Sequence, residues 1–193
     1  MRELVFLLEE PSARAMLESL LPRILSEEIN FRLIAFEGKQ DLEKQITRKI
    51  RSYLNHHARF IVLRDQDSHP QCQKLKQNLL DLCHASGKGT HCMVRIACRE
   101  LETFYLADLQ AVEQGLKIRD LASKQSSSKF RSPDYLGSPS HELKTLTKQR
   151  YEKVSGSREI GKYLKLENHR SPSFRNLIAA IYRLQRDLLA IDL

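Results

Sequence analysis

The stretch E-L-V-F-L-L-E-E-P-S-A-R-A-M-L-E-S-L-L, residues 3–21, sets the first unit of the fold. The apolar run at 3–8 has the length of a buried strand, and two acids followed by Pro11 end it. Apolar side chains then recur at helical spacing, at Ala15, Met16, Leu17, Leu20, Leu21 and Ile24. The stretch therefore predicts a strand, a tight turn and a helix that Ser12 caps.

The same unit recurs further along the chain. Apolar runs predict three more strands, at residues 29–36, 60–63 and 92–98. Helical periodicity predicts helices at about 41–54, at about 71–86, and through Tyr105 and Leu109. Strands that alternate with amphipathic helices are typical of an α/β layer with right-handed crossovers. The sequence therefore predicts an α/β fold with a mostly parallel four-stranded sheet flanked by helices.

Beyond Gln114 the pattern loosens, so we divide the chain into an α/β domain at 1–114 and a basic helical extension at 115–193. The extension is predicted to hold a Ser- and Pro-rich surface loop at 123–140, then helices near 158–164 and from Pro172 onward, the last capped by Ser171. The last helix carries an apolar stripe of Phe174, Leu177, Ile178, Ile181, Leu184 and Leu188. We expect the stripe to pack in the core, and a partner helix or a homodimer contact is the alternative.

Charge is unevenly distributed along the 193 residues, whose formal net charge is +8. Residues 1–114 hold 16 basic and 16 acidic side chains, whereas residues 115–186 hold 16 basic and 6 acidic ones. Such a concentration of positive charge attracts phosphate-rich or acidic partners. A face kept soluble by lysines explains the charge equally well, so both interpretations stay open.

Several classes of protein are excluded. No window approaches the length of a membrane span, and the apolar run at 4–8 is too short for a secretory signal. The four cysteines include no C-x-x-C pair, so we expect reduced thiols in a cytoplasmic protein. Zinc is disfavoured because only His69 and Cys72 approach the spacing of zinc ligands.

Pairs of acids follow three of the four predicted strands. They are Glu9 with Glu10, Asp65 with Asp67, and Glu100 with Glu102. Because the carboxyl ends of parallel strands share one edge of a sheet, these side chains are expected to lie near one another. Crowded carboxylates repel unless a cation neutralises them, and Mg²⁺ suits a site made of oxygen ligands. The alternative is that each acid merely caps the helix that follows it.

The order of these motifs resembles the Toprim fold, the Mg²⁺-binding domain of topoisomerases, primases and the overcoming-lysogenization-defect nucleases. The resemblance rests on L-E-E-P-S at 8–12 and D-Q-D at 65–67. A longer match, through E-G-K-Q-D-L at 37–42, L-R-D-Q-D at 63–67 and R-E-L-E-T-F-Y-L-A-D at 99–108, resembles bacterial Toprim-related proteins of unassigned function. Members of that group are often encoded beside an AAA-type ATPase and are suspected in phage defence.

The resemblance assigns roles to residues. Glu9 matches the Toprim glutamate, which acts as a metal ligand or as a general acid and base, and Asp65 and Asp67 match the metal-binding pair. Glu10, Glu100 and Glu102 are expected as additional metal ligands. In the family the glutamate is usually followed by glycine, and this chain departs from that pattern with Glu10.

The implied activity is phosphodiester cleavage that needs Mg²⁺ or Mn²⁺, by a nuclease subunit that acts with an AAA-type ATPase. Lys39 is the expected catalytic cation, with Arg64 as the alternative. Nucleic acid would be held through its phosphates by six basic residues of the extension, Lys144, Lys148, Arg150, Lys153, Arg158 and Lys162. The alternative function is a non-catalytic module that docks a partner or nucleic acid.

Overall fold

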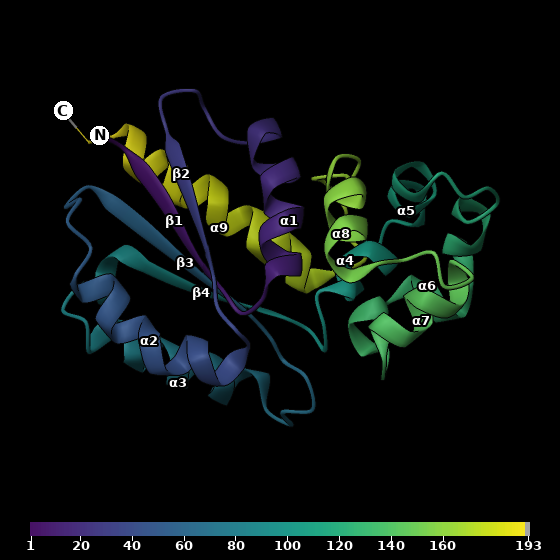
Figure 1. Ribbon diagram of the computed structural model, residues 1–193, viewed down its shortest axis with the longest axis horizontal. Coiled ribbons are helices and arrows are strands. Elements are labelled where there is room, and N and C mark those ends of the chain that lie inside the picture. The colour runs from purple at the N-terminus through teal and green to yellow at the C-terminus, as the bar shows by residue number, and fades with distance from the viewer. Residues whose placement is uncertain (192–193) are drawn as a thin grey trace.

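Four parallel strands form one sheet in the order β2–β1–β3–β4 in the computed structural model, which describes residues 1–191. The strands are β1 (Glu3–Leu8), β2 (Asn30–Ala35), β3 (Ala58–Asp65) and β4 (Cys92–Ala97). Every neighbouring pair of strands is parallel, which confirms the predicted α/β fold and its parallel sheet. All four carboxyl ends therefore lie at the same edge of the sheet (Figure 1).

The central strand β1 is buried on both faces. Leu4, Phe6 and Leu8 pack into one apolar cluster, while Val5 and Leu7 pack into a second cluster on the other face. Successive side chains of a strand point to opposite faces, and both faces are covered here. This arrangement explains why the sequence of β1 is a continuous apolar run rather than an alternating one.

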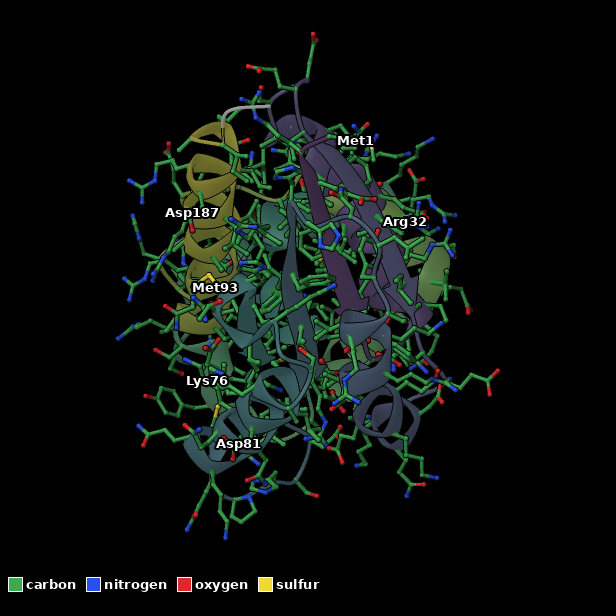
Figure 2. All side chains as sticks on the ribbon, turned by 90° about the vertical axis from the view of Figure 1, so that its left-hand side faces the viewer. Met1, Arg32, Lys76, Asp81, Met93 and Asp187 are labelled. Atoms are coloured by element: carbon green, nitrogen blue, oxygen red, sulfur yellow. The ribbon has the colours of Figure 1, made fainter. Side chains whose placement is uncertain are left out.

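Two helices cover each face of the sheet (Figure 1). One face carries α2 (Lys39–Arg51) and α3 (Cys72–His84), and the other carries α1 (Pro11–Leu20) and α9 (Pro172–Leu189). In the side view of Figure 2, Asp81 of α3 and Asp187 of α9 lie on opposite sides of the sheet. Among residues 1–191, no helix combines the length and the hydropathy that crossing a membrane requires.

Helix α9 packs on the sheet through its apolar stripe. All six predicted stripe residues are buried, and the helix contacts β1, β3 and β4. The expected core packing is thus confirmed. The Ser171 hydroxyl accepts a hydrogen bond from the Phe174 N–H at 3.1 Å, which confirms the predicted cap as well.

A helical lobe, residues 102–161, lies beside the sheet on the right of Figure 1. Its α-helices are α4 (Glu102–Leu106), α5 (Leu109–Leu116), α6 (Ser128–Arg131), α7 (Pro139–Leu146) and α8 (Lys153–Gly161). The lobe also contains the short 3₁₀ helices η3 (Ala122–Ser126) and η4 (Pro133–Tyr135), while η1 (Leu21–Arg23) and η2 (Gly89–His91) lie outside it. The predicted loop at 123–140 thus contains short helical turns, which buried Phe130 and Pro133 anchor, and they are too short to produce a periodic pattern.

Several helix boundaries differ from the prediction, among them the start of α8 at Lys153 instead of near residue 158. Helix α1 begins at Pro11, so Ser12 is not its cap, and the Ser12 hydroxyl instead donates to Glu10 Oε1 at 2.9 Å. The helix predicted through Tyr105 is interrupted at Asp108, which caps α5 by accepting a hydrogen bond from the Ala111 N–H at 3.2 Å. At α5 a side-chain hydrogen bond fixes a boundary that apolar spacing does not reveal, whereas α1 begins at Pro11 without a side-chain cap.

The division of the chain at residue 114 stays a prediction, but residues on its two sides pack closely together. Helix α8 lies against α1 at Gly161, where an added Cβ would stand 2.7 Å from the carbonyl oxygen of Met16. Only a residue without a side chain permits this approach of two backbones.

Replacing Gly161 with alanine is expected to lower the free energy of unfolding by about 1–3 kcal/mol, because the new methyl group must push α8 away from α1. Gly137→Ala is the matched control, since a Cβ there meets nothing within 4 Å. Urea unfolding of the two variants measures the difference. Equal stability of both variants would contradict the close packing of α8 on α1.

Candidate active site

Glu9 joins the ends of the two central strands. It follows β1 directly, and its N–H donates to the carbonyl oxygen of Leu63 in β3 at 3.2 Å. Its carboxylate Oε2 then accepts a hydrogen bond from the Asp65 N–H at 3.0 Å. The parallel pairing of β1 with β3 therefore brings together two acids that stand 56 residues apart, as the sequence predicted.

Asp65 is the last residue of β3 and is buried. Burial raises the pKa of its carboxyl well above the ordinary value, and the nearby carboxylates of Glu9, Glu102 and Glu10 raise it further. Burial also raises the pKa of Glu9. The end of the sheet thus holds several carboxyl groups in a place where negative charge is unfavourable unless a cation accompanies it.

Glu102 is more fully buried than Asp65, with 1% of its surface exposed against 9%. It begins α4, and its side chain is almost fully buried. Its Oε1 accepts a hydrogen bond from the Tyr151 hydroxyl at 2.9 Å, and that hydroxyl also lies 3.1 Å from Ser157 Oγ. Its Oε2 has no hydrogen-bond partner among the described residues. Burial raises the pKa of Glu102 too. A proton or a bound cation would therefore stabilise this carboxyl group.

Glu100 has a different role from its neighbour. Its Oε2 accepts a hydrogen bond from the Ser140 N–H at 2.6 Å, in the first turn of α7. Glu100 and Glu102 therefore hold two separate parts of the helical lobe, one through Ser140 and one through Tyr151. The sequence did not indicate these contacts, because the partners of both acids lie 40 or more residues further along the chain.

Two lysines neutralise the outer carboxylates of the site. Lys39, at the start of α2, places Nζ 2.9 Å from Asp67 Oδ2, and this contact raises the pKa of the lysine. Lys153, at the start of α8, places Nζ 2.7 Å from Glu10 Oε2. Burial lowers the pKa of Lys153, but the carboxylates of Glu10, Glu102 and Asp65 together outweigh burial and the net shift is upward. Both lysines are therefore ammonium ions beside the acids.

Arg64 places a third cation behind the acids. It is buried, its Nε lies 3.9 Å from Glu9 Oε2, and its terminal nitrogen lies 3.4 Å from Glu43 Oε1. Two of its nitrogens, Nε and NH1, make no hydrogen bond with a described residue. A buried guanidinium at this distance partly offsets the negative charge of Glu9.

The position after Glu9 departs from the family pattern without strain. Glu10 has φ −150° and ψ 164°, which is extended backbone that any residue adopts. Asp67, by contrast, has φ +53°, in the left-handed region that aspartate and asparagine tolerate better than most residues. Of these two turns, only the one after β3 has a strained backbone. Such strain is common at functional sites, which is consistent with a functional role for Asp67.

The donor atoms suit a hard divalent cation, although they do not form a finished cage. No group of three or more His, Cys, Asp or Glu side chains within residues 1–191 is spaced to hold an ion as the structure stands. The available donors of Glu9, Asp65 and Asp67 are nevertheless all oxygens, and Glu102 adds a buried oxygen without a partner. This donor chemistry fits Mg²⁺ or Mn²⁺. The four cysteines are free thiols.

The six basic residues predicted to bind nucleic acid fall into two groups. Three make ion pairs within the protein, Lys153 with Glu10, Arg158 with Glu18, and Lys162 with Glu159. The other three, Lys144, Lys148 and Arg150, are exposed and make no ion pair with a described residue. Only the second group is free to meet phosphates without breaking an existing contact.

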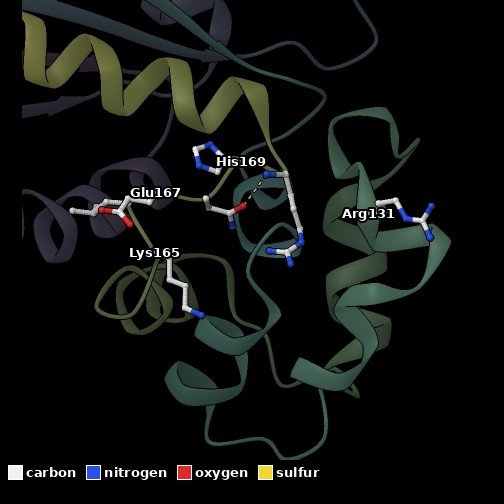
Figure 3. A pocket seen from close by; sticks show the side chains of 7 residues that line it. Arg131, Lys165, Glu167 and His169 are labelled. Atoms are coloured by element: carbon white, nitrogen blue, oxygen red, sulfur yellow. Dashed lines mark hydrogen bonds between the residues drawn. The ribbon is translucent and has the colours of Figure 1, made fainter.

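Another hollow of the described chain lies apart from these acids. It encloses about 770 Å³ beside the segment that leads into α9, and Figure 3 shows Lys165, Glu167, His169 and Arg131 around it. None of the predicted site residues lines it. Buried Asn168 shapes its wall by donating to the carbonyl oxygen of Ala107 at 2.6 Å.

Comparisons with known proteins agree with the geometry. A family model described as "Domain of unknown function (DUF4276)" matches residues 8–182. The C-terminal region of the Burkholderia pseudomallei OLD protein is similar in structure, with a TM-score of 0.55 and 16% sequence identity over 95% of this chain and 98% of that chain. No curated protein matches the sequence. The structural likeness confirms the expected Toprim-like fold.

Proposed function

For this chain, which belongs to the family described as Domain of unknown function (DUF4276), we propose a nuclease activity that needs Mg²⁺ or Mn²⁺ to cleave phosphodiester bonds. The observation that carries the proposal is the environment of Asp65. This buried carboxyl has Glu9 and Glu102 as neighbours, and Glu102 keeps a buried oxygen without a partner. Such crowding destabilises the metal-free protein and is relieved by a bound cation.

In the proposed site Asp65, Asp67 and Glu9 would hold the ion, with Glu10 and Glu102 as further ligands. The bound ion would supply an activated water and stabilise the leaving oxygen. Glu9 is suited to exchange a proton with the substrate, because burial brings its pKa upward from the ordinary carboxyl value. Lys39 stands beside Asp67, where its ammonium would meet a phosphate oxygen.

We extend the proposal to an AAA-type ATPase partner and to phage defence. The support is the motif resemblance to Toprim-related proteins encoded beside such an ATPase, together with the structural likeness to the OLD protein. The ion pairs of Lys153 with Glu10 and of Lys39 with Asp67 suggest what this partner would change. A partner that draws Lys39 or Lys153 away would free a carboxylate for the ion.

A cleavage assay tests the proposal. Wild-type protein is expected to cut fluorescent single-stranded and duplex oligonucleotides with Mg²⁺ or Mn²⁺ and to be inactive with a chelator. Asp67→Asn keeps the left-handed turn, because asparagine adopts φ near +53° as readily as aspartate, and it is expected to slow cleavage at least about tenfold. Asp81→Asn on α3 is the matched control and is expected to cut like the wild type.

The second candidate function is a docking module without catalysis. The ion pairs Lys39–Asp67 and Lys153–Glu10 favour it, because both outer carboxylates already have a cation. It requires binding that is independent of metal and weakened by salt, with no cleavage in any divalent ion. Cleavage that disappears in Asp67→Asn and persists in Asp81→Asn would exclude it.

A further inference from the structure

A second hollow of the helical lobe is lined mainly by cations. It encloses about 580 Å³ between the turn after α5 and the turn after α7. Its charged lining residues are Lys117, Arg119, Lys124, Lys148, Arg150 and a single acid, Asp120. We call these six residues the basic hollow. Three of its five cations, Lys117, Arg119 and Lys124, are not among the binding residues predicted from the sequence.

The basic hollow has two walls: the first is the turn after α5 and the second is the turn after α7. Side-chain hydrogen bonds fix both walls. In the first wall, Glu113 Oε2 accepts from the N–H groups of Leu121 and Ala122 at 2.8 and 2.9 Å. In the second wall, the Thr147 hydroxyl donates to the carbonyl oxygen of Leu143 at 2.8 Å and accepts from the Tyr151 N–H at 3.2 Å. The cations take no part in these bonds, so the walls are built without them.

Strained backbone gathers in the same two turns. Six residues other than glycine have positive φ among the described residues, and four of them belong to these turns, Lys117, Asp120, Lys148 and Gln149. The remaining two are Asp67 and Arg99, which lie at the acidic end of the sheet. Such conformations cost about 1–3 kcal/mol each and concentrate at functional sites. The strain thus marks two places, the candidate active site and the basic hollow.

The cations of the basic hollow are available to a ligand. All five are exposed, and none forms an ion pair with a described residue. Lys153 and Arg158 of α8, in contrast, are held by Glu10 and Glu18. Five cations against one acid around the same hollow create a strong local positive potential, which draws multiply charged anions such as phosphates.

The second wall of the basic hollow leads directly to the acidic end of the sheet. Arg150 is followed by Tyr151, whose hydroxyl donates to Glu102, and three residues after Arg150 comes Lys153, which pairs with Glu10. Three extended residues span at most about 11 Å. A chain of phosphates held in the hollow is therefore within reach of the carboxylates that surround Asp65.

We propose that the basic hollow binds consecutive phosphates of a nucleic acid strand and positions that strand across the candidate active site. No aromatic residue of the described part of the chain lines the hollow, so bases are not stacked there and binding is independent of sequence. The strand's orientation toward the acids rests on the proposed nuclease function. The binding of phosphates rests on the hollow alone.

The test compares two triple variants that remove the same charge. Lys117→Gln/Arg119→Gln/Lys148→Gln neutralises the hollow, and Lys44→Gln/Arg48→Gln/Lys49→Gln neutralises three exposed cations of α2 as the control. Binding of a fluorescent single-stranded oligonucleotide is measured in chelator across a salt series. The hollow variant is expected to bind at least about tenfold more weakly, with a salt slope smaller by about two. Equal melting temperatures of both variants show that each is folded.

Three results would overturn the proposal. The first is an equal loss of affinity in both variants, and the second is wild-type affinity in the hollow variant. The third is competition by inorganic tripolyphosphate as strong as that by the oligonucleotide at equal phosphate concentration, which would make the hollow a site for free phosphate chains. Binding in chelator needs no cleavage, so a wild type that binds through the hollow but never cuts contradicts only the nuclease function.

Discussion

Replacing Asp65 with asparagine is expected to slow cleavage strongly and, at the same time, to raise the melting temperature of the metal-free protein. The Asp65 carboxyl is buried beside Glu9 and Glu102, and its charge is costly there. Asparagine has nearly the same shape without the charge. A bound cation supplies several kcal/mol of transition-state stabilisation, so losing a central ligand should slow cleavage at least about a hundredfold. Relief of the repulsion should raise the melting temperature by a few degrees, at about 2–4 °C per kcal/mol.

The pH dependence of stability provides a further readout of Asp65. Because its pKa is higher in the folded than in the unfolded chain, the folded state binds more protons between the two values. The free energy of unfolding of the wild type should therefore fall as the pH rises above about 3.9 and through the raised pKa of the folded state. In Asp65→Asn this fall should be smaller.

Adding Mg²⁺ separates the two effects of this substitution. The wild type is expected to melt at a higher temperature with Mg²⁺, and Asp65→Asn is expected to show little change. Asp81→Asn serves again as the control and should respond to Mg²⁺ like the wild type. Wild-type cleavage rates in Asp65→Asn, or a lower melting temperature of that variant without metal, would contradict the assigned role of Asp65.

Replacing Phe174 with alanine is expected to destabilise the whole chain by about 3–5 kcal/mol. Phe174 is buried in the first turn of α9, and its ring centroid lies 5.1 Å from that of Phe104 in α4. The side chain thus joins the last helix of the chain to the start of the helical lobe. At about 2–4 °C per kcal/mol, the melting temperature should fall by roughly 10 °C in a single transition.

Tyr182→Ala is the control for this prediction, because Tyr182 lies on the same helix with 41% of its surface exposed. Its substitution should change the free energy of unfolding by less than about 0.5 kcal/mol. Calorimetry of both variants measures their melting temperatures and the number of unfolding transitions. Two separate transitions in Phe174→Ala, with only one displaced, would show that the segments before and after residue 114 unfold independently.

The strands and the acidic end of the sheet were predictable because they depend on local patterns. The run at 3–8 is apolar throughout since both faces of β1 are covered, and acids that follow parallel strands must share an edge. Glu9 and Asp65 meet through strand pairing alone. The order of strands and acids in the sequence was therefore enough to predict that Glu9 and Asp65 lie close together.

The partners of the acids could not be predicted because they come from distant parts of the chain. Lys153 reaches Glu10 across 143 residues, and Tyr151 reaches Glu102 across 49. These contacts depend on how the helical lobe packs against α1, which no periodicity encodes. The basic hollow was missed for the same reason, since Lys117 and Lys148 become neighbours only through the turns that surround them.

The position of α9 has a consequence for how the protein folds during its synthesis. One face of the sheet stays without part of its cover until residues 172–189 have left the ribosome, because this helix packs on β1, β3 and β4. Contacts between segments that lie far apart in the sequence form late and slow the search for the native state. Until then the nascent protein displays a large apolar surface, so its yield in a cell should depend on chaperones that shield such surfaces.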